Sequence, residues 1–250
     1  RHRRRLDCAD GADTTRTAIS GWTTGASNDI TVQAVAGKHD GRSRDISGTG
    51  YQISGSNANG VVDMGEDYVT LIGLDIKSTS ASPAVQMANA AVTSGDNHRK
   101  LFDCIIHGSN TSSSTPCLSA SLANLVMTAQ NCMIYGGNRG LDTRNSASAT
   151  LSFLTLVRTQ GRYGFVSDSE ANIRNCYSGH TAGSLEDFWT GGAAPSGDYN
   201  ASSDTSAATD YTNNLVSKAA TDQFIDVGFS TMDLLLKTGN VLDGAGVTIS

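Results

Sequence analysis

The stretch QNCMIYGG at residues 130–137 has two close relatives in the same chain, FDCIIHG at 102–108 and RNCYSG at 174–179. In each, an Asn or Asp precedes a Cys, and bulky and then small residues follow. Short phrases of this kind, closed by Gly, Asn, Asp or Ser, are typical of β-strands that end in tight turns. Their recurrence indicates an internal repeat, which has to be analysed before local structure is assigned.

Two series of apolar anchor residues keep step along the chain. The first series is separated by 30, 28, 22 and 22 residues and consists of Leu74, Cys104, Cys132, Leu154 and Cys176. The second follows it and consists of Val61, Val85, Cys117, Leu141, Phe165 and Phe188. A repeat of about 22–24 residues is too short for a βαβ unit, which needs about 30 or more. It fits one coil of two or three short strands, stacked on its neighbours so that equivalent residues form columns.

The stacking predicts that Cys104, Cys132 and Cys176 share one inward-facing column. Asp103, Asn131 and Asn175 then lie at a bend, where their side chains satisfy backbone groups. The chain has five cysteines and no CxxC pair. We therefore interpret the repeated cysteines as reduced core thiols, and not as disulfides or metal ligands.

Several phrases resemble the right-handed parallel β-helix family of pectate lyases and phage tailspikes, most closely the β-helical proteins of bacteriophage virions. They are the opening ISGWTTGASNDITVQAV, GEDYVTLIGLDIK at 65–77, GDYNASSDTSA, and DQFIDVGFSTMDLLLKTGNVLDGAG. The resemblance implies an all-β, right-handed parallel β-helix of about seven coils with a C-terminal segment folded back on it.

The expected division of the chain is a basic N-terminal arm at 1–14, the parallel β-helix at 15–200, and a capping and fold-back segment at 201–250. The arm carries the run RHRRR. The run MDLLLK at 232–237 is the most apolar part of the tail, so we expect it to pack against the wall of the helix. Both ends need covers, because an open coil presents bare strand edges.

Composition excludes several function classes. The 250 residues carry a formal net charge of −6, which argues against a nucleic-acid-binding surface over the whole body. No apolar stretch approaches the roughly 20 residues that span a bilayer, so we expect no membrane insertion. Zinc-enzyme and phosphate-loop patterns are missing, and we expect no cofactor and no metal.

Candidate catalytic residues are the carboxylates near the second series, Asp142, Asp168 and Asp187. Enzymes of the family that the chain resembles use such acids in pairs or clusters on an outer face. Asp142 and Asp168 follow their anchors by one and three residues, whereas Asp187 precedes its own, so they need not share a face. The interpretation as turn residues and solvated surface is therefore preferred. Trp189, beside a loop of small residues, is the candidate for carbohydrate binding.

The leading functional prediction is a non-catalytic structural component of a bacteriophage virion, as a capsid decoration or tail-associated protein. Its partners would be other virion proteins or host glycans, and it could form a homo-oligomer. One alternative is a polysaccharide-binding or -degrading tailspike module, whose activity would be that of a lyase or a glycoside hydrolase. The other is a secreted, extracellular adhesin.

Overall fold

The structure is a computed structural model. It describes residues 4–8, 12–34, 51–87, 97–108, 115–120, 122–146, 148–158, 163–167, 171–180, 186–190, 195–207, 213–226, 233–239 and 242.

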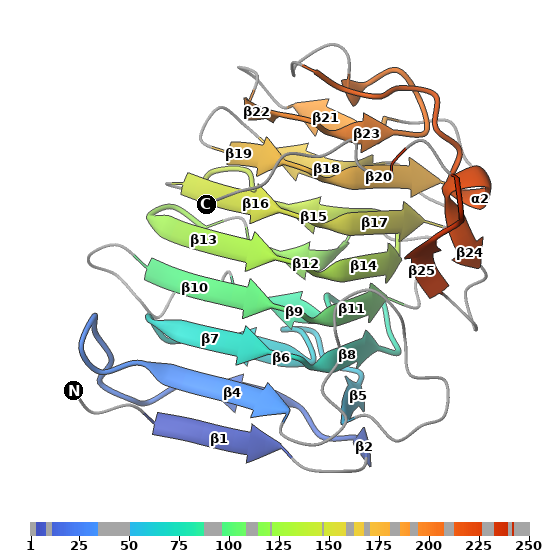
Figure 1. Ribbon diagram of the computed structural model, residues 1–250. Coiled ribbons are helices and arrows are strands. Elements are labelled where there is room, and N and C mark those ends of the chain that lie inside the picture. The colour runs from blue at the N-terminus through green and yellow to red at the C-terminus, as the bar shows by residue number, and fades with distance from the viewer. Residues whose placement is uncertain are drawn as a thin grey trace.

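Three parallel sheets, here called A, B and C, run along the molecule (Figure 1), and neighbouring strands in each come from successive coils. Sheet A contains β1 (Arg4–Cys8), β4 (Ile30–Ala34), β7 (Val69–Ile72), β10 (Asn97–Phe102), β13 (Leu125–Gln130), β16 (Ser148–Ser152), β19 (Ala171–Arg174) and β22 (Ser196–Asp198). Sheet B contains β2 (Ala12–Asp13), β5 (Gln52–Gly55), β8 (Asp75–Ser78), β11 (Ile105–Gly108), β14 (Met133–Gly136), β17 (Thr155–Arg158), β20 (Tyr177–His180) and β23 (Ala201–Ser202). Sheet C contains β3 (Thr17–Ile19), β6 (Val62–Met64), β9 (Val85–Gln86), β12 (Pro116–Ser119), β15 (Arg139–Asp142), β18 (Tyr163–Ser167) and β21 (Phe188–Thr190).

One strand from each sheet makes a coil, so β1 to β21 form seven coils, and β22 and β23 begin an eighth. The predicted parallel β-helix of about seven coils is confirmed. Its interior is filled by the inward side chains of all three sheets, which form one continuous apolar cluster.

From the third coil to the eighth, a single residue in the left-handed backbone conformation turns the chain from sheet A to sheet B. Asp103, Asn131 and Asn175 have φ of 56°, 53° and 52° at this corner. Asn and Asp tolerate that conformation better than most residues, so the predicted bend positions are confirmed. The corner also stacks, because the Asn131 side-chain amide donates to the Asp103 carboxylate over 2.7 Å.

The corner cysteines lie just inside the bend, with Leu74 and Leu154 in the same buried column. All three thiols are free and at most 2% exposed. Each thiol also donates to the carbonyl two residues before it, at Sγ–O distances of 3.3, 3.3 and 3.2 Å for Cys104, Cys132 and Cys176. Cysteine therefore fills the core and at the same time satisfies a corner carbonyl.

The second series of anchors was wrong by one position at two places. Leu118 pairs with Leu141 and Val85, where the sequence pattern used Cys117, and Val62 replaces Val61. Both members of each pair are apolar and buried, so periodicity alone does not distinguish them. Cys117 instead directs its thiol to the carbonyls of Tyr135 and Gly136.

The first coil differs from the expected arm at 1–14. Arg4–Cys8 pairs with β4 over five residues, and Ala12–Asp13 pairs with β5. A strand can add to a sheet through its backbone without an apolar face, which is why composition did not reveal it. The charged side chains of β1 are exposed, as is usual for a protected edge strand.

The tail folds back along the outside of sheet B (Figure 1), where α2 (Ala220–Gln223) precedes an antiparallel pair of β24 (Phe224–Asp226) and β25 (Asp233–Leu236). Phe224 packs edge-on against Tyr177, with ring centroids 4.9 Å apart. The Tyr177 hydroxyl donates to the carbonyl of Lys218 over 2.7 Å. The predicted fold-back is confirmed. β25 lies within MDLLLK, and the side chains of residues 232–236, whose packing was predicted, lie outside the described part.

Phe153 occupies the same corner with a φ of 54° and a ring that is 38% exposed. A left-handed conformation costs an ordinary residue about 1–2 kcal/mol, and Asn less. We expect Phe153→Asn to raise the free energy of unfolding by about 1 kcal/mol, measured by urea denaturation. The reciprocal Asn131→Phe should lower it by a similar amount. A destabilised Phe153→Asn protein would contradict this account.

Two of the corner thiols, Cys132 and Cys176, should resist alkylation in the folded protein. Burial raises the pKa of Cys176 to about 12 and places the pKa of Cys132 well above its usual range. Both groups are therefore protonated at pH 8, and the thiolate is the reactive form. We expect iodoacetamide at pH 8 to leave both residues unmodified until guanidinium unfolds the chain, as followed by peptide mass spectrometry. Modification of either residue without unfolding would contradict this expectation.

Candidate functional site

The outer face of sheet C carries one column of side chains that crosses six coils. The strand registers align, from coil 2 to coil 7, Asp63, Gln86, Ser119, Asp142, Val166 and Trp189. Beside this column, Arg139 pairs with Tyr163 at the starts of β15 and β18. The column brings polar, acidic and aromatic groups from distant parts of the sequence to one surface.

At the C-terminal end of the column, two aromatic rings meet. Tyr163 and Trp189 have ring centroids 5.1 Å apart, and both side chains are half-buried. The guanidinium of Arg139 lies 5.8 Å from the Tyr163 ring centroid, and that of Arg144 lies 5.6 Å from the Trp189 centroid. We call Arg139, Asp142, Arg144, Tyr163 and Trp189 the sheet C platform.

Asp142 holds the cations of the platform in place. The Arg144 guanidinium donates to both carboxylate oxygens, at 3.0 and 2.6 Å, and Arg139 lies 3.5 Å from one of them. Bidentate pairing fixes the plane of a guanidinium. Asp142 is 4% exposed. Its role at the platform is therefore to position the two arginines that lie beside the rings.

Asp187 belongs to a different cluster, at the corner where the last coil closes. Its carboxylate is fully buried and accepts from the Ser203 hydroxyl at 2.6 Å and from the Ser203 backbone N–H at 2.7 Å. His180 lies 3.2 Å away through Nδ1, and the backbone N–H of Asp204 lies at 3.2 Å. Asp187 therefore ties β20 to the segment that follows β23.

The cluster contains a serine, a histidine and an aspartate, but it does not have the geometry of a catalytic triad. Ser203 Oγ and the Asp187 carboxylate both approach His180 Nδ1, at 3.0 and 3.2 Å. A triad histidine contacts its serine and its aspartate through opposite ring nitrogens, so that a proton can pass between them. The cluster therefore has a structural role, which is to hold β20 to the segment that follows β23.

The structure places two of the three predicted acids in different clusters. Asp142 contacts the platform arginines and Asp187 contacts the His180 corner, whereas Asp168 lies outside the described residues. The other acid in the sheet C column, Asp63, is three rungs from Asp142, or roughly 14 Å at the usual strand spacing. Paired glycosidase carboxylates lie roughly 5–9.5 Å apart.

Sequence reasoning singled out Trp189 and Asp142 but not the contacts that join them to one platform. Arg139 and Tyr163 come together only when neighbouring coils stack, and Arg144 joins them from the turn after β15. In the described ranges, no group of three or more His, Cys, Asp or Glu side chains is arranged to hold a metal ion. Those ranges also contain no helix that is long and apolar enough to cross a membrane.

No protein-family model and no curated protein matches this sequence. Two solved structures share its fold, and both are crystal structures of the pectin methylesterase from Aspergillus niger. In its deglycosylated form the TM-score is 0.52 at 14% identity, over 86% of this chain and 74% of that chain. In its penultimately deglycosylated form the TM-score is 0.51 at 12% identity, over 86% and 75%. The chain is a right-handed parallel β-helix, a fold that it shares with a carbohydrate-active enzyme.

The hydrogen bonds of the Asp187 cluster predict that a small change to this side chain lowers the stability of the protein strongly. Asp187→Asn keeps the size of the side chain but replaces an accepting oxygen with an amide that faces backbone donors. We expect the free energy of unfolding to fall by about 2 kcal/mol, because hydrogen bonds to a buried charge are lost. Guanidinium denaturation measures this. The matched control is the exposed neighbour, Glu186→Gln, which should change stability by less than about 0.5 kcal/mol. Equal changes in the free energy of unfolding for the two variants would show that the cluster does not stabilise the fold.

Proposed function

We propose that this protein binds polysaccharide through the sheet C platform and does not cleave it. The observation that carries the proposal is the contact between Tyr163 and Trp189, with a guanidinium beside each ring. A sugar presents an apolar C–H face and a rim of hydroxyl groups. Aromatic rings match the face, and fixed arginine donors match the rim.

The platform is preorganised for this task. Its residues lie on strands or directly after one, and Asp142 fixes the two guanidinium groups before any ligand arrives. A site built on rigid strands loses little conformational entropy on binding. The binding surface is local to the end of the column, because the next two column residues, Val166 and Asp142, are 1% and 4% exposed.

Binding without cleavage is favoured by the state of the acids. Glycoside hydrolysis needs one carboxyl group that gives up a proton and a second at a short separation. In the described part of the platform, Asp142 is the one carboxylate, and both its oxygens face arginine donors. Both of its oxygens are therefore occupied by arginine, and no second carboxylate of the platform stands beside it.

The similar structures support the choice of ligand class in a limited way. Their name identifies pectin, a polysaccharide, as what that enzyme acts on. At 14% identity the likeness extends to the fold, and the platform residues carry the rest of the proposal.

The test is affinity electrophoresis of the protein in gels that contain single soluble polysaccharides, with polygalacturonate among them. We expect at least one polymer to retard the protein, and Trp189→Ala to weaken that retardation about tenfold or more, as for a central aromatic contact. Phe153→Asn is the matched control, because it removes an exposed aromatic ring from another corner. No retardation by any polymer, or equal retardation of the Trp189→Ala protein, would refute binding at the platform. New reducing ends would refute the absence of cleavage.

The narrower prediction of a virion component, located on a capsid or tail, rests on the sequence resemblance. Neither of the two similar structures is a virus protein. Extracellular location, contact with virion proteins and homo-oligomer formation likewise stay predictions. Electron cryomicroscopy of the particle or extract that contains this chain tests them together, because it shows what each face of the helix contacts.

A further inference from the structure

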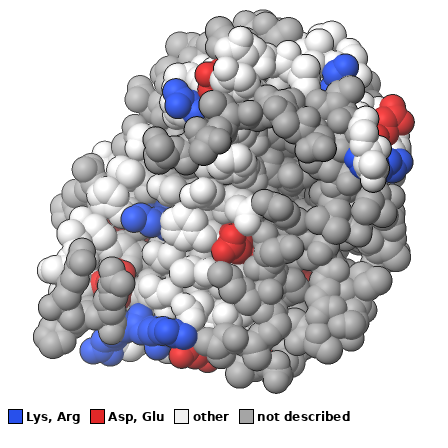
Figure 2. All heavy atoms as spheres, in the orientation of Figure 1, with Lys and Arg blue, Asp and Glu red and all other residues white. Residues whose placement is uncertain are grey.

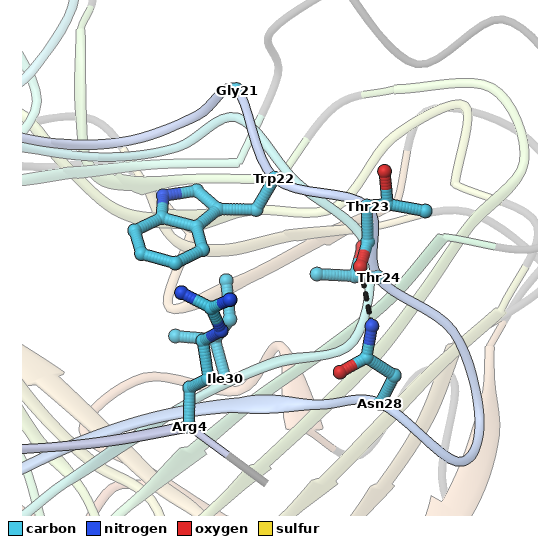
Figure 3. A pocket seen from close by; sticks show the side chains of 7 residues that line it. All are labelled: Arg4, Gly21, Trp22, Thr23, Thr24, Asn28 and Ile30. Atoms are coloured by element: carbon cyan, nitrogen blue, oxygen red, sulfur yellow. Dashed lines mark hydrogen bonds between the residues drawn. The ribbon is translucent and has the colours of Figure 1, made fainter. Parts of the chain in front are cut away.

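A separate pocket lies beside the first coil, six coils from Trp189. It has a volume of about 330 Å³ (Figure 3) and is lined by Arg4, Gly21, Trp22, Thr23, Thr24, Asn28 and Ile30. The indole ring of Trp22 and the guanidinium of Arg4 stand on one side, and the side chains of Thr24 and Asn28 stand on the other. The volume is at the lower end of the range for small-molecule sites and suits one sugar unit.

The loop that forms this pocket is held by its own hydrogen bonds. Gly25 and Asn28 exchange two backbone bonds, of 3.1 and 2.9 Å, and the Asn28 amide donates to the carbonyl of Thr23 over 2.5 Å. The backbone N–H of Trp22 donates to the Glu66 carboxylate over 2.9 Å. On the other side, the backbone N–H of Arg4 donates to the carbonyl of Asp29 over 3.1 Å. The walls of the pocket are therefore in place without a ligand.

The chemistry of the lining selects an anion that carries an apolar surface. Among the described residues, the lining contains one cation and no carboxylate. The Arg4 guanidinium lies 4.3 Å from the Trp22 ring centroid, and Trp22 is 42% exposed. The neighbouring Arg5 differs, because its guanidinium is paired with Asp7. Figure 2 shows Lys and Arg side chains at this end of the molecule with acidic side chains close beside them, so the preference for an anion rests on the one cation of the lining, Arg4.

We propose that this pocket binds a single sugar unit that carries a carboxylate. The carboxylate accepts from the Arg4 guanidinium, and an apolar face of the sugar ring contacts Trp22. The side-chain oxygen of Asn28 points towards the open space in Figure 3, and the Thr24 side chain lies near it, so both can meet ring hydroxyls. The site is distinct from the sheet C platform, and it stands whether or not the platform binds a polymer.

The chain offers a sharp test, because it contains two tryptophans. Trp189→Phe leaves Trp22 as the reporter of fluorescence. In this variant we expect sodium glucuronate to change the Trp22 emission saturably, and glucose at the same concentration and matched ionic strength to have no effect. Arg4→Gln in the same background should weaken the glucuronate response about tenfold or more. Arg5→Gln is the matched control and should leave the response unchanged.

Several outcomes would overturn the proposal. An equal response to glucose would remove the role of the carboxylate, and an equal response to sodium acetate would reduce the pocket to a simple anion site. A response that survives Arg4→Gln would place the ligand elsewhere. Circular dichroism of each variant checks that the helix is folded. The platform test follows a polymer and depends on Trp189, whereas this test follows a monosaccharide without that residue, so the two proposals can fail independently.

Discussion

The left-handed residue at the corner between sheets A and B is the constraint on which the rest of this structure depends. From the third coil on, one residue bends the chain between the two sheets, and its backbone N–H still bonds to the next coil, as from Asn131 to the carbonyl of Ser152 over 3.1 Å. The hydrogen-bonded ladder is therefore continuous around the bend. Because these coils turn at the same point, the residue just after the corner points inward in each of them, and the column of Cys104, Cys132 and Cys176 forms.

The corner and the core could be predicted from the sequence because they are local and repeat. In an Asn–Cys phrase, the Asn indicates the left-handed backbone conformation at the corner, and the Cys indicates that the next side chain is buried. Sheet C was harder to place, because neighbouring apolar residues such as Cys117 and Leu118 fit the period equally well. The first coil was missed for the opposite reason, since β1 pairs through its backbone and has no apolar pattern to detect.

The candidate sites could be predicted from the sequence less well than the corner and the core. Trp189 and Asp142 could be singled out as residue types, but their partners are set by coil register, which shifts with every loop between strands. Arg139 meets Tyr163 across one rung, and Ser203 meets Asp187 across another. No short stretch of sequence contains either pair. The same stacking separated Asp142 from Asp187, which the spacing of their anchors had left open.

The corner column has an evolutionary consequence. From Cys132 to Phe153 the chain completes one circuit of 22 residues and returns to an equivalent position, with Leu154 on the next level. Loss of such a circuit would set Leu154 directly on Cys104, again one apolar side chain on another. Whole circuits can therefore be deleted or duplicated without a new type of interface between levels. The length of this molecule is then a quantity that selection can adjust in steps, independently of the surfaces that it displays.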